Sequence, residues 1–126
     1  MNKQTPYAAL SRTTCRTKAT DYYIRFPSCC AKLFDGAKRC YVLKTDGNDY
    51  IVIQPIWKHE NNENPWTHAL FQEKKGHCTR ISVTGKVRNG YLPSRFFDGS
   101  HYKIKRRGSN GSVYICLDEP IKEDEA

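Results

Sequence analysis

Short runs of alternating apolar and polar residues recur along this chain, and each run is bounded by glycine, proline, asparagine or aspartate. Two pairs of runs surround a turn dipeptide: 41–44 and 50–53 around Asp46-Gly47, and 102–105 and 114–117 around Asn110-Gly111. Asp-Gly or Asn-Gly between alternating runs is the strongest short-range signal for a β-hairpin. The pattern predicts two hairpins in a mostly β chain, a β-rich α+β protein.

The two hairpins belong to a longer repeat that spans residues 13–56 and 79–121. In each copy an extended run, 13–26 or 79–92, leads to a proline, Pro27 or Pro93, and a helical turn follows. After each turn come Phe-Asp-Gly, the hairpin and Pro-Ile. One such unit cannot bury its apolar face alone. We therefore expect a single domain over 1–126, folded as a pseudo-twofold β-barrel of two strand–turn–hairpin repeats.

The segment 57–78 between the copies is predicted to be a linker with one short helix. Asn64 is a good N-cap, Pro65 suits the first helical position, and Gly76 suits the stop. Three apolar residues would share the helix face that covers the barrel: Trp66, Ala69 and Leu70.

The formal charge of +8 understates how basic the folded body is. The end of the chain, 118–126, holds five acids and one lysine, so residues 1–117 carry 20 basic and 8 acidic residues, or +12. A body this positive attracts polyanions, although it is also compatible with a merely soluble basic surface. The acidic C-terminal tail, 118–126, is expected to be a disordered, solubilising end, or else a competitor with DNA for the basic face.

Several functional classes are disfavoured by the composition. The start of the chain has no apolar run of the secretory kind, which favours a cytoplasmic protein with reduced cysteines and no membrane partner. We find no Gly-rich phosphate loop, nucleophile elbow or paired zinc-ligand spacing, so no catalytic residue, metal or cofactor is predicted. Cys40 and Cys116 fall within predicted strands and are expected to be buried thiols.

The order of strand, aliphatic-Pro, short helix, Gly, strand, turn, strand and Pro resembles the swapped-hairpin DNA-binding domains of the AbrB and MraZ (SpoVT-AbrB) type. The segment 81–93 is most similar to the family's strand that runs into its Ile-Pro. The family usually places an arginine four residues before the proline, where this chain has Tyr23 and Asn89. The resemblance covers both repeats and implies a tandem arrangement as in MraZ-like proteins.

The resemblance also implies that duplex DNA meets the first hairpin of each unit. Carried over by position, the DNA-binding residues are Arg12, Arg16, Lys18 and Arg25 in the first unit and Arg80, Lys86, Arg88 and Arg95 in the second. The charge density of these segments agrees with phosphate neutralisation. A secondary basic patch, which could touch phosphate or be a solvated face, comprises Lys103, Lys105, Arg106 and Arg107.

These features favour a small transcriptional regulator that binds duplex DNA as a pseudo-dimeric monomer or a homodimer, nucleoid-associated in the cytoplasm. The alternative is a phage- or plasmid-type interaction protein that binds and inhibits a host protein. Three tyrosines among the cations could stack on exposed bases or pack at the barrel rim: Tyr22, Tyr23 and Tyr91.

Overall fold

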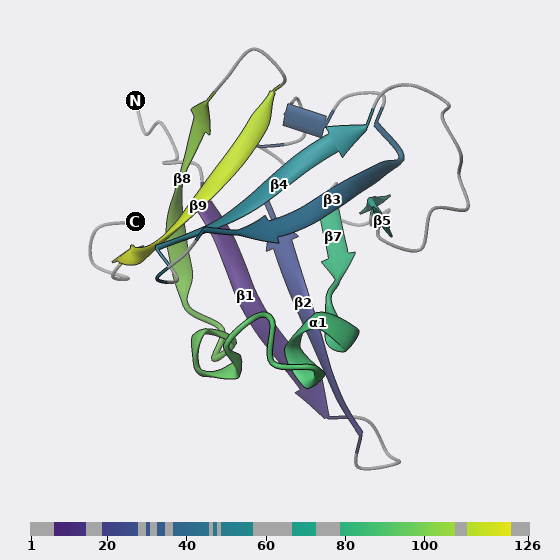
Figure 1. The fold of residues 1–126 in the computed structure, drawn as a ribbon, viewed down its shortest axis with the longest axis vertical. Coiled ribbons are helices and arrows are strands. Elements are labelled where there is room, and N and C mark those ends of the chain that lie inside the picture. The colour runs from purple at the N-terminus through teal and green to yellow at the C-terminus, as the bar shows by residue number, and fades with distance from the viewer. Residues whose placement is uncertain are drawn as a thin grey trace.

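The computed structural model describes residues 7–14, 19–27, 30, 33–34, 37–45, 47, 49–56, 67–72, 79–107 and 111–121. These residues form one antiparallel sheet with a short α-helix beside it (Figure 1). The elements are β1 (Tyr7–Thr14), β2 (Thr20–Phe26), β3 (Arg39–Lys44), β4 (Tyr50–Ile56), β5 (Thr67–Ala69), β6 (Phe71–Gln72), β7 (Thr79–Ser82), α1 (Thr84–Arg88), the 3-10 helix η3 (Ser94–Phe96), β8 (His101–Arg107) and β9 (Ser112–Ile121).

The sheet curls into a nearly closed barrel. Its strand order is β5-β3-β4-β9-β8-β1-β2-β7-β6, so β5 and β6 stand at opposite ends of that order. Only Leu70 separates these two strands along the chain, while His68 of β5 pairs with β3 and Phe71 of β6 pairs with β7. When β5 and β6 are counted as one bent strand, the described residues form an eight-strand antiparallel barrel with one short helix.

Both predicted hairpins are confirmed. Strand β3 pairs with β4 and β8 pairs with β9, each in antiparallel register. Gly47 and Gly111 stand in the two turns with φ of 80° and 73°. Only glycine adopts this left-handed conformation without strain, which explains why the two dipeptides specify the hairpins.

A tight turn follows each of the two prolines, as predicted. The Cys30 N–H donates a hydrogen bond to the Pro27 carbonyl at 2.9 Å, and the Phe96 N–H donates to the Pro93 carbonyl at 3.4 Å. Each turn delivers a phenylalanine into the core a few residues later. Both rings, Phe34 and Phe97, are fully buried.

The barrel interior is filled by the inward-facing residue of each alternating pair. Ile51 of β4 and Ile115 of β9 lie opposite each other and are completely buried. The free thiols of Cys40 and Cys116 are buried as expected. Burial raises the pKa of the Cys40 thiol to about 12, so this thiol stays protonated at neutral pH.

The predicted linker helix is wrong where the structure describes it. Residues 67–69 and 71–72 are strands, and the remaining parts of the segment, with Asn64, Pro65, Trp66 and Gly76, lie outside the described residues. The reason is tertiary pairing, which overrides local helix propensity. The Arg39 guanidinium donates from Nε to Thr67 Oγ1 at 2.7 Å and from Nη2 to the Thr67 carbonyl at 3.0 Å, fixing β5 against β3.

The predicted extended run 79–92 is also wrong beyond Ser82. The chain turns there into α1, because the Thr84 hydroxyl accepts the Tyr22 N–H at 3.0 Å and Val87 packs into the core. Gly90, with φ of 85°, lies in the turn after the helix. The second repeat therefore has a helix, and no first hairpin, before its proline.

In the first repeat the run 13–26 is a chain reversal, not one extended strand. Thr14 at the end of β1 pairs with Thr20 at the start of β2. The hairpin predicted for this unit by the family resemblance thus has its strands at 7–14 and 20–26.

The acidic tail is shorter than predicted. Residues 118–121 belong to β9, and Pro120 pairs with Tyr102 of β8. Residues 122–126 lie outside the described part of the chain. Pro120 is tolerated in this ladder because β4 pairs with β9 only over 113–116, so the missing N–H of Pro120 costs no hydrogen bond to β4.

Candidate nucleic-acid interface

One end of the barrel is built from segments that are far apart in the sequence. In Figure 1, β1 and β2 reach further down than the other strands, and α1 and the chain after it lie beside their lower part. The Gly99 N–H donates to the Leu10 carbonyl at 2.7 Å, and the Leu10 N–H donates to the Ser100 carbonyl at 3.2 Å. These bonds fix the loop after η3 to β1.

Arg88, at the last position of α1, contacts the β1–β2 hairpin directly. Its Nη2 donates a hydrogen bond to the Thr20 carbonyl at 3.2 Å, and the side chain is exposed. Arginine has five N–H donors, so donors remain for a ligand.

Arg12 lies at the same end, two residues before Thr14, which pairs with Thr20 in the β1–β2 ladder. It occupies the face of β1 that carries the buried Ala8 and Leu10, but it is exposed because it lies beyond the packed interior. Hydrogen bonds from Ser100 hold the pKa of Asp98 below its usual range, and the charge of Arg12 adds to this effect. Arg12 is therefore close enough to Asp98 for electrostatic interaction.

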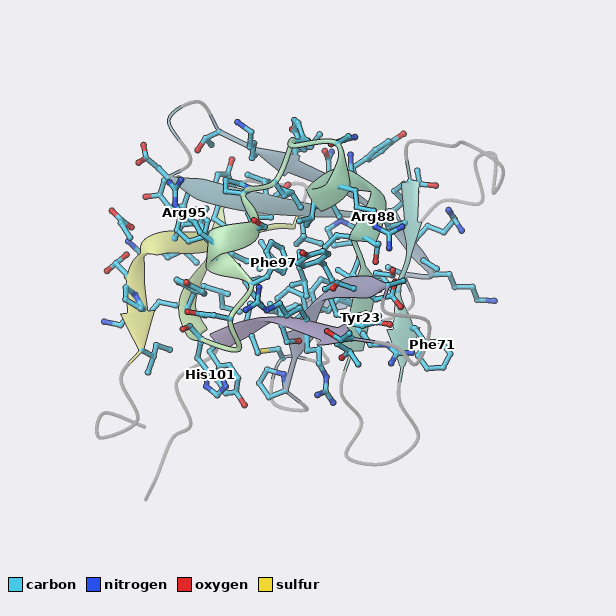
Figure 2. All side chains as sticks on the ribbon, turned by 90° about the horizontal axis from the view of Figure 1, so that it is seen from below. Tyr23, Phe71, Arg88, Arg95, Phe97 and His101 are labelled. Atoms are coloured by element: carbon cyan, nitrogen blue, oxygen red, sulfur yellow. The ribbon has the colours of Figure 1, made fainter. Side chains whose placement is uncertain are left out.

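Arg95 and Lys86 complete this group. The Arg95 guanidinium lies over the Phe96 ring at 4.8 Å from its centroid, and the side chain is exposed on η3. Seen from this end, Arg88 and Arg95 lie on two sides of the barrel with Phe97 between them (Figure 2). Lys86 extends from α1 over the Tyr91 ring, with Nζ at 4.9 Å from the centroid. We call these four residues the basic end: Arg12, Lys86, Arg88 and Arg95.

The charge of Lys86 also affects the pKa of His68, whose side chain connects β5 to β7. His68 Nδ1 is 3.1 Å from the Ser82 carbonyl, so Nδ1 carries the proton and donates it. Burial lowers the pKa of His68, and the charge of Lys86 lowers it further, while the bond to Ser82 opposes the shift. His68 is consequently held toward its neutral form where the barrel wall closes.

Two of the predicted residues lie elsewhere. Arg25 and Arg80 pair directly with each other on β2 and β7, on the outer wall, because their neighbours Ile24 and Ile81 point inward. The structure thus separates a wall pair from the basic end. Arg16 and Lys18 lie outside the described residues.

The secondary patch lies on β8. Lys103 and Lys105 are exposed, whereas Tyr102 of the same strand is buried against the core. Lys105 Nζ is 3.3 Å from Glu119 Oε2 in a solvent-exposed ion pair, which is worth little to stability. Arg106 and Arg107 belong to β8, and their side chains lie outside what the structure describes.

Sequence reasoning missed Phe71, whose side chain is 55% exposed on β6. It falls in the segment predicted as a helical linker, where no charge or turn signal distinguishes it. A β-favouring aromatic next to polar Gln72 was the only available indication of a strand.

The described residues supply positive charge but no candidate metal site. No group of three or more His, Cys, Asp or Glu side chains in the described ranges is placed to hold a metal ion. None of the helices described there is long and apolar enough to cross a membrane. The basic end can instead supply several positive donors to a polyanion.

Comparison with known proteins gave no match to a family model, to a curated protein or to a solved structure. The resemblance to AbrB- and MraZ-type domains therefore stays a prediction.

Proposed function

We propose that this protein binds duplex DNA through its basic end and acts as a small transcriptional regulator. The observation that carries the proposal is the contact between Arg88 and Thr20, which brings α1 to the β1–β2 hairpin although the two residues are 68 positions apart in the sequence. Three exposed cations, Arg12, Arg88 and Arg95, and the half-buried Lys86 belong to segments that meet at this end of the barrel. Phosphate binding needs such a cluster, and scattered surface charge does not supply it.

The shape of this end also supports duplex DNA as the partner. The major groove of B-form DNA admits an α-helix or a two-stranded β-ribbon, and the β1–β2 hairpin is such a ribbon. The connection between Thr14 and Thr20 contains two further cations, Arg16 and Lys18. Arginines here can pair bidentately with guanine as well as with phosphate.

Two acids moderate the charge of the basic end. Asp98 is engaged by the Ser100 N–H at 3.0 Å, and Asp21 lies 3.4 Å from the Thr84 hydroxyl that donates to it. Both carboxylates therefore organise the loops around the cations. Four cations that each neutralise one phosphate would give log K a slope of about −3.6 against log salt.

We also infer that the barrel consists of two equivalent halves. The runs 50–53 and 114–117 match in sequence, and in the β4–β9 ladder the matching residues Ile51 and Ile115 stand directly opposite each other. The matching Tyr50 and Tyr114 contact edge to face, with centroids 5.6 Å apart. Pairing of equivalent residues is what a twofold axis through this ladder requires.

The halves differ where the proposed function needs them to differ. Phe26 ends β2 directly before Pro27, whereas α1 lies between β7 and Pro93. With one hairpin and one helix at the same end, we propose a single DNA-binding surface in place of two equivalent hairpins.

Selection of bound fragments from a pool of random duplex DNA tests the proposal. Enrichment of a sequence motif by the full chain is the expected result. The proposal would be contradicted if no fragment were enriched and the protein were not retained on duplex DNA at low salt. A protein-directed inhibitor would then be the better account.

A further inference from the structure

Three planar side chains from three adjacent strands lie together on the outer wall. They are Tyr23 of β2, Arg80 of β7 and Phe71 of β6. The Arg80 guanidinium carbon is 5.0 Å from the Tyr23 ring centroid and 5.0 Å from the Phe71 ring centroid. Figure 2 shows Tyr23 and Phe71 as neighbours at one edge of the molecule. We call these three residues the wall stack.

The register of the strands produces the wall stack. Phe71 is paired with Arg80, and Tyr23 is paired with Ser82, two residues further along β7. Side chains at i and i+2 share a face of a strand, so Tyr23 reaches Arg80 diagonally. The guanidinium is thereby held between two rings, and little of its rotamer entropy remains to be lost on binding.

The wall stack leaves a large aromatic surface in water. Phe71 is 55% exposed, and Leu43, at 42%, is the other large apolar side chain of comparable exposure among the described residues. Leu43 belongs to β3 and lies in no such stack among the contacts described. An exposed ring in contact with an arginine presents an apolar face and a positive charge side by side.

Arg25 extends the charge of this surface. It is exposed and stands directly opposite Arg80 in the β2–β7 ladder. The two guanidinium groups therefore bring two positive charges side by side on the outer wall. Aromatic rings interleaved with cations are the arrangement by which proteins bind unpaired bases and the phosphates between them.

We propose that the wall stack is a binding site for single-stranded nucleic acid, in which an unpaired base stacks on Phe71 and the flanking phosphates contact Arg80 and Arg25. This goes beyond the proposed duplex binding, because bases inside a duplex do not expose a face to stack on. The chemistry needed is a base attached to a phosphodiester, and single-stranded DNA and RNA share it. The 2′-hydroxyl is the difference that separates these two sources.

The test measures fluorescence anisotropy of labelled oligonucleotides of about twelve residues, a length within the range of single-strand sites. The probes are oligo(dT), oligo(rU), an abasic DNA oligomer with the same number of phosphates, and a duplex. The proteins are the full chain, Phe71→Ala, the matched control Leu43→Ala, and Arg88→Ala. Phe71 and Leu43 are both exposed, so neither substitution opens a cavity in the core.

Phe71→Ala is expected to weaken oligo(dT) or oligo(rU) binding roughly tenfold and to leave duplex binding unchanged. Leu43→Ala should leave both unchanged, and the abasic oligomer should bind wild type as weakly as oligo(dT) binds Phe71→Ala. A preference for oligo(rU) would identify RNA, and equal binding would identify a base-and-phosphate site indifferent to the sugar.

Abasic and base-containing oligomers that bind equally would overturn the proposal, as would a Phe71→Ala variant that behaves like Leu43→Ala. Arg88→Ala separates this proposal from the duplex one. It should reduce duplex binding and preserve the difference between oligo(dT) and the abasic oligomer, so either proposal can fail while the other stands.

Discussion

Arg88 Nη2 lies 3.2 Å from the carbonyl oxygen of Thr20 and donates a hydrogen bond to it, joining the short helix to the start of the second strand. The bond is exposed, so its contribution to stability is small, of the order of 1 kcal/mol. Its consequence is positional, because it places an arginine of the second repeat beside the hairpin of the first.

Substitution of Arg88 is therefore expected to change DNA binding more than folding. Arg88→Ala should weaken binding to duplex DNA about fivefold to tenfold and reduce the salt slope of log K by about 1. Arg88→Lys should keep the slope, because it keeps the charge, while losing the fork geometry. Titrations at several salt concentrations measure both quantities. Lys103→Ala, on exposed β8, is the control, and an equal loss in that variant would argue against the basic end.

The two glycines around α1 should respond to alanine with opposite signs. Gly85 lies within the helix and has nothing within 4 Å of an added Cβ, so Gly85→Ala should stabilise the protein by about 0.5–1 kcal/mol. Gly90 has equal space but a φ of 85°, so Gly90→Ala should destabilise it by about 1–2 kcal/mol. Urea unfolding measures both free energies. Two changes of the same sign would contradict the helix boundaries described above.

The partial burial of His68 makes the stability of the fold depend on pH in one direction. Burial, and then the charge of Lys86, lowers the pKa of His68 in the folded protein, so the unfolded chain binds a proton at a higher pH. The contribution of His68 is complete above the unfolded value, about pH 6.5, and is lost as the pH falls below it.

This expectation is checked by comparing wild type with His68→Asn, which cannot titrate but retains a donor for Ser82. As the pH falls from 7.5 to 5.5, the unfolding free energy of wild type should decrease relative to that of His68→Asn. A difference that stays constant across that range would show that His68 is not shielded in the folded state.

The end of the chain is expected to oppose non-specific binding. Deleting residues 122–126 removes one lysine and three acids and raises the formal charge from +8 to +10. Affinity for random duplex DNA at low salt should rise, and the gain should vanish as salt screens it. Replacing the three acids by their amides is the matched control of constant length. Unchanged affinity in both variants would retire the idea of competition.

The parts of the fold that could be predicted are those specified locally. Asp-Gly and Asn-Gly fix the hairpins because Gly47 and Gly111 need a positive φ, and the prolines fix the turns that follow them. The strands β5 and β6 could not be predicted in this way. Their conformation depends on partners in β3 and β7, and Thr67 and Phe71 carry no local signal strong enough to show it.

The candidate site, too, could be predicted only in part from the sequence. Charge density along the sequence pointed to both the basic end and the wall pair, yet it could not separate Arg12 and Arg88 from Arg25 and Arg80. The separation follows from two structural facts: strand alternation turns Arg25 outward, and α1 replaces the strand expected before Pro93. The prediction of a helix over Phe71 concealed the more exposed of the two aromatic residues of the wall stack.

The central claim is that duplex DNA is bound by the basic end and not by positive charge in general. Its most direct test is the affinity for one duplex, at one low salt concentration, of two variants of equal charge: Arg12→Gln with Arg88→Gln, and Lys103→Gln with Lys105→Gln. We predict that the first double variant loses affinity by a factor of about ten or more. The second double variant should change the affinity by less than about threefold. Equal losses in the two variants would contradict the account.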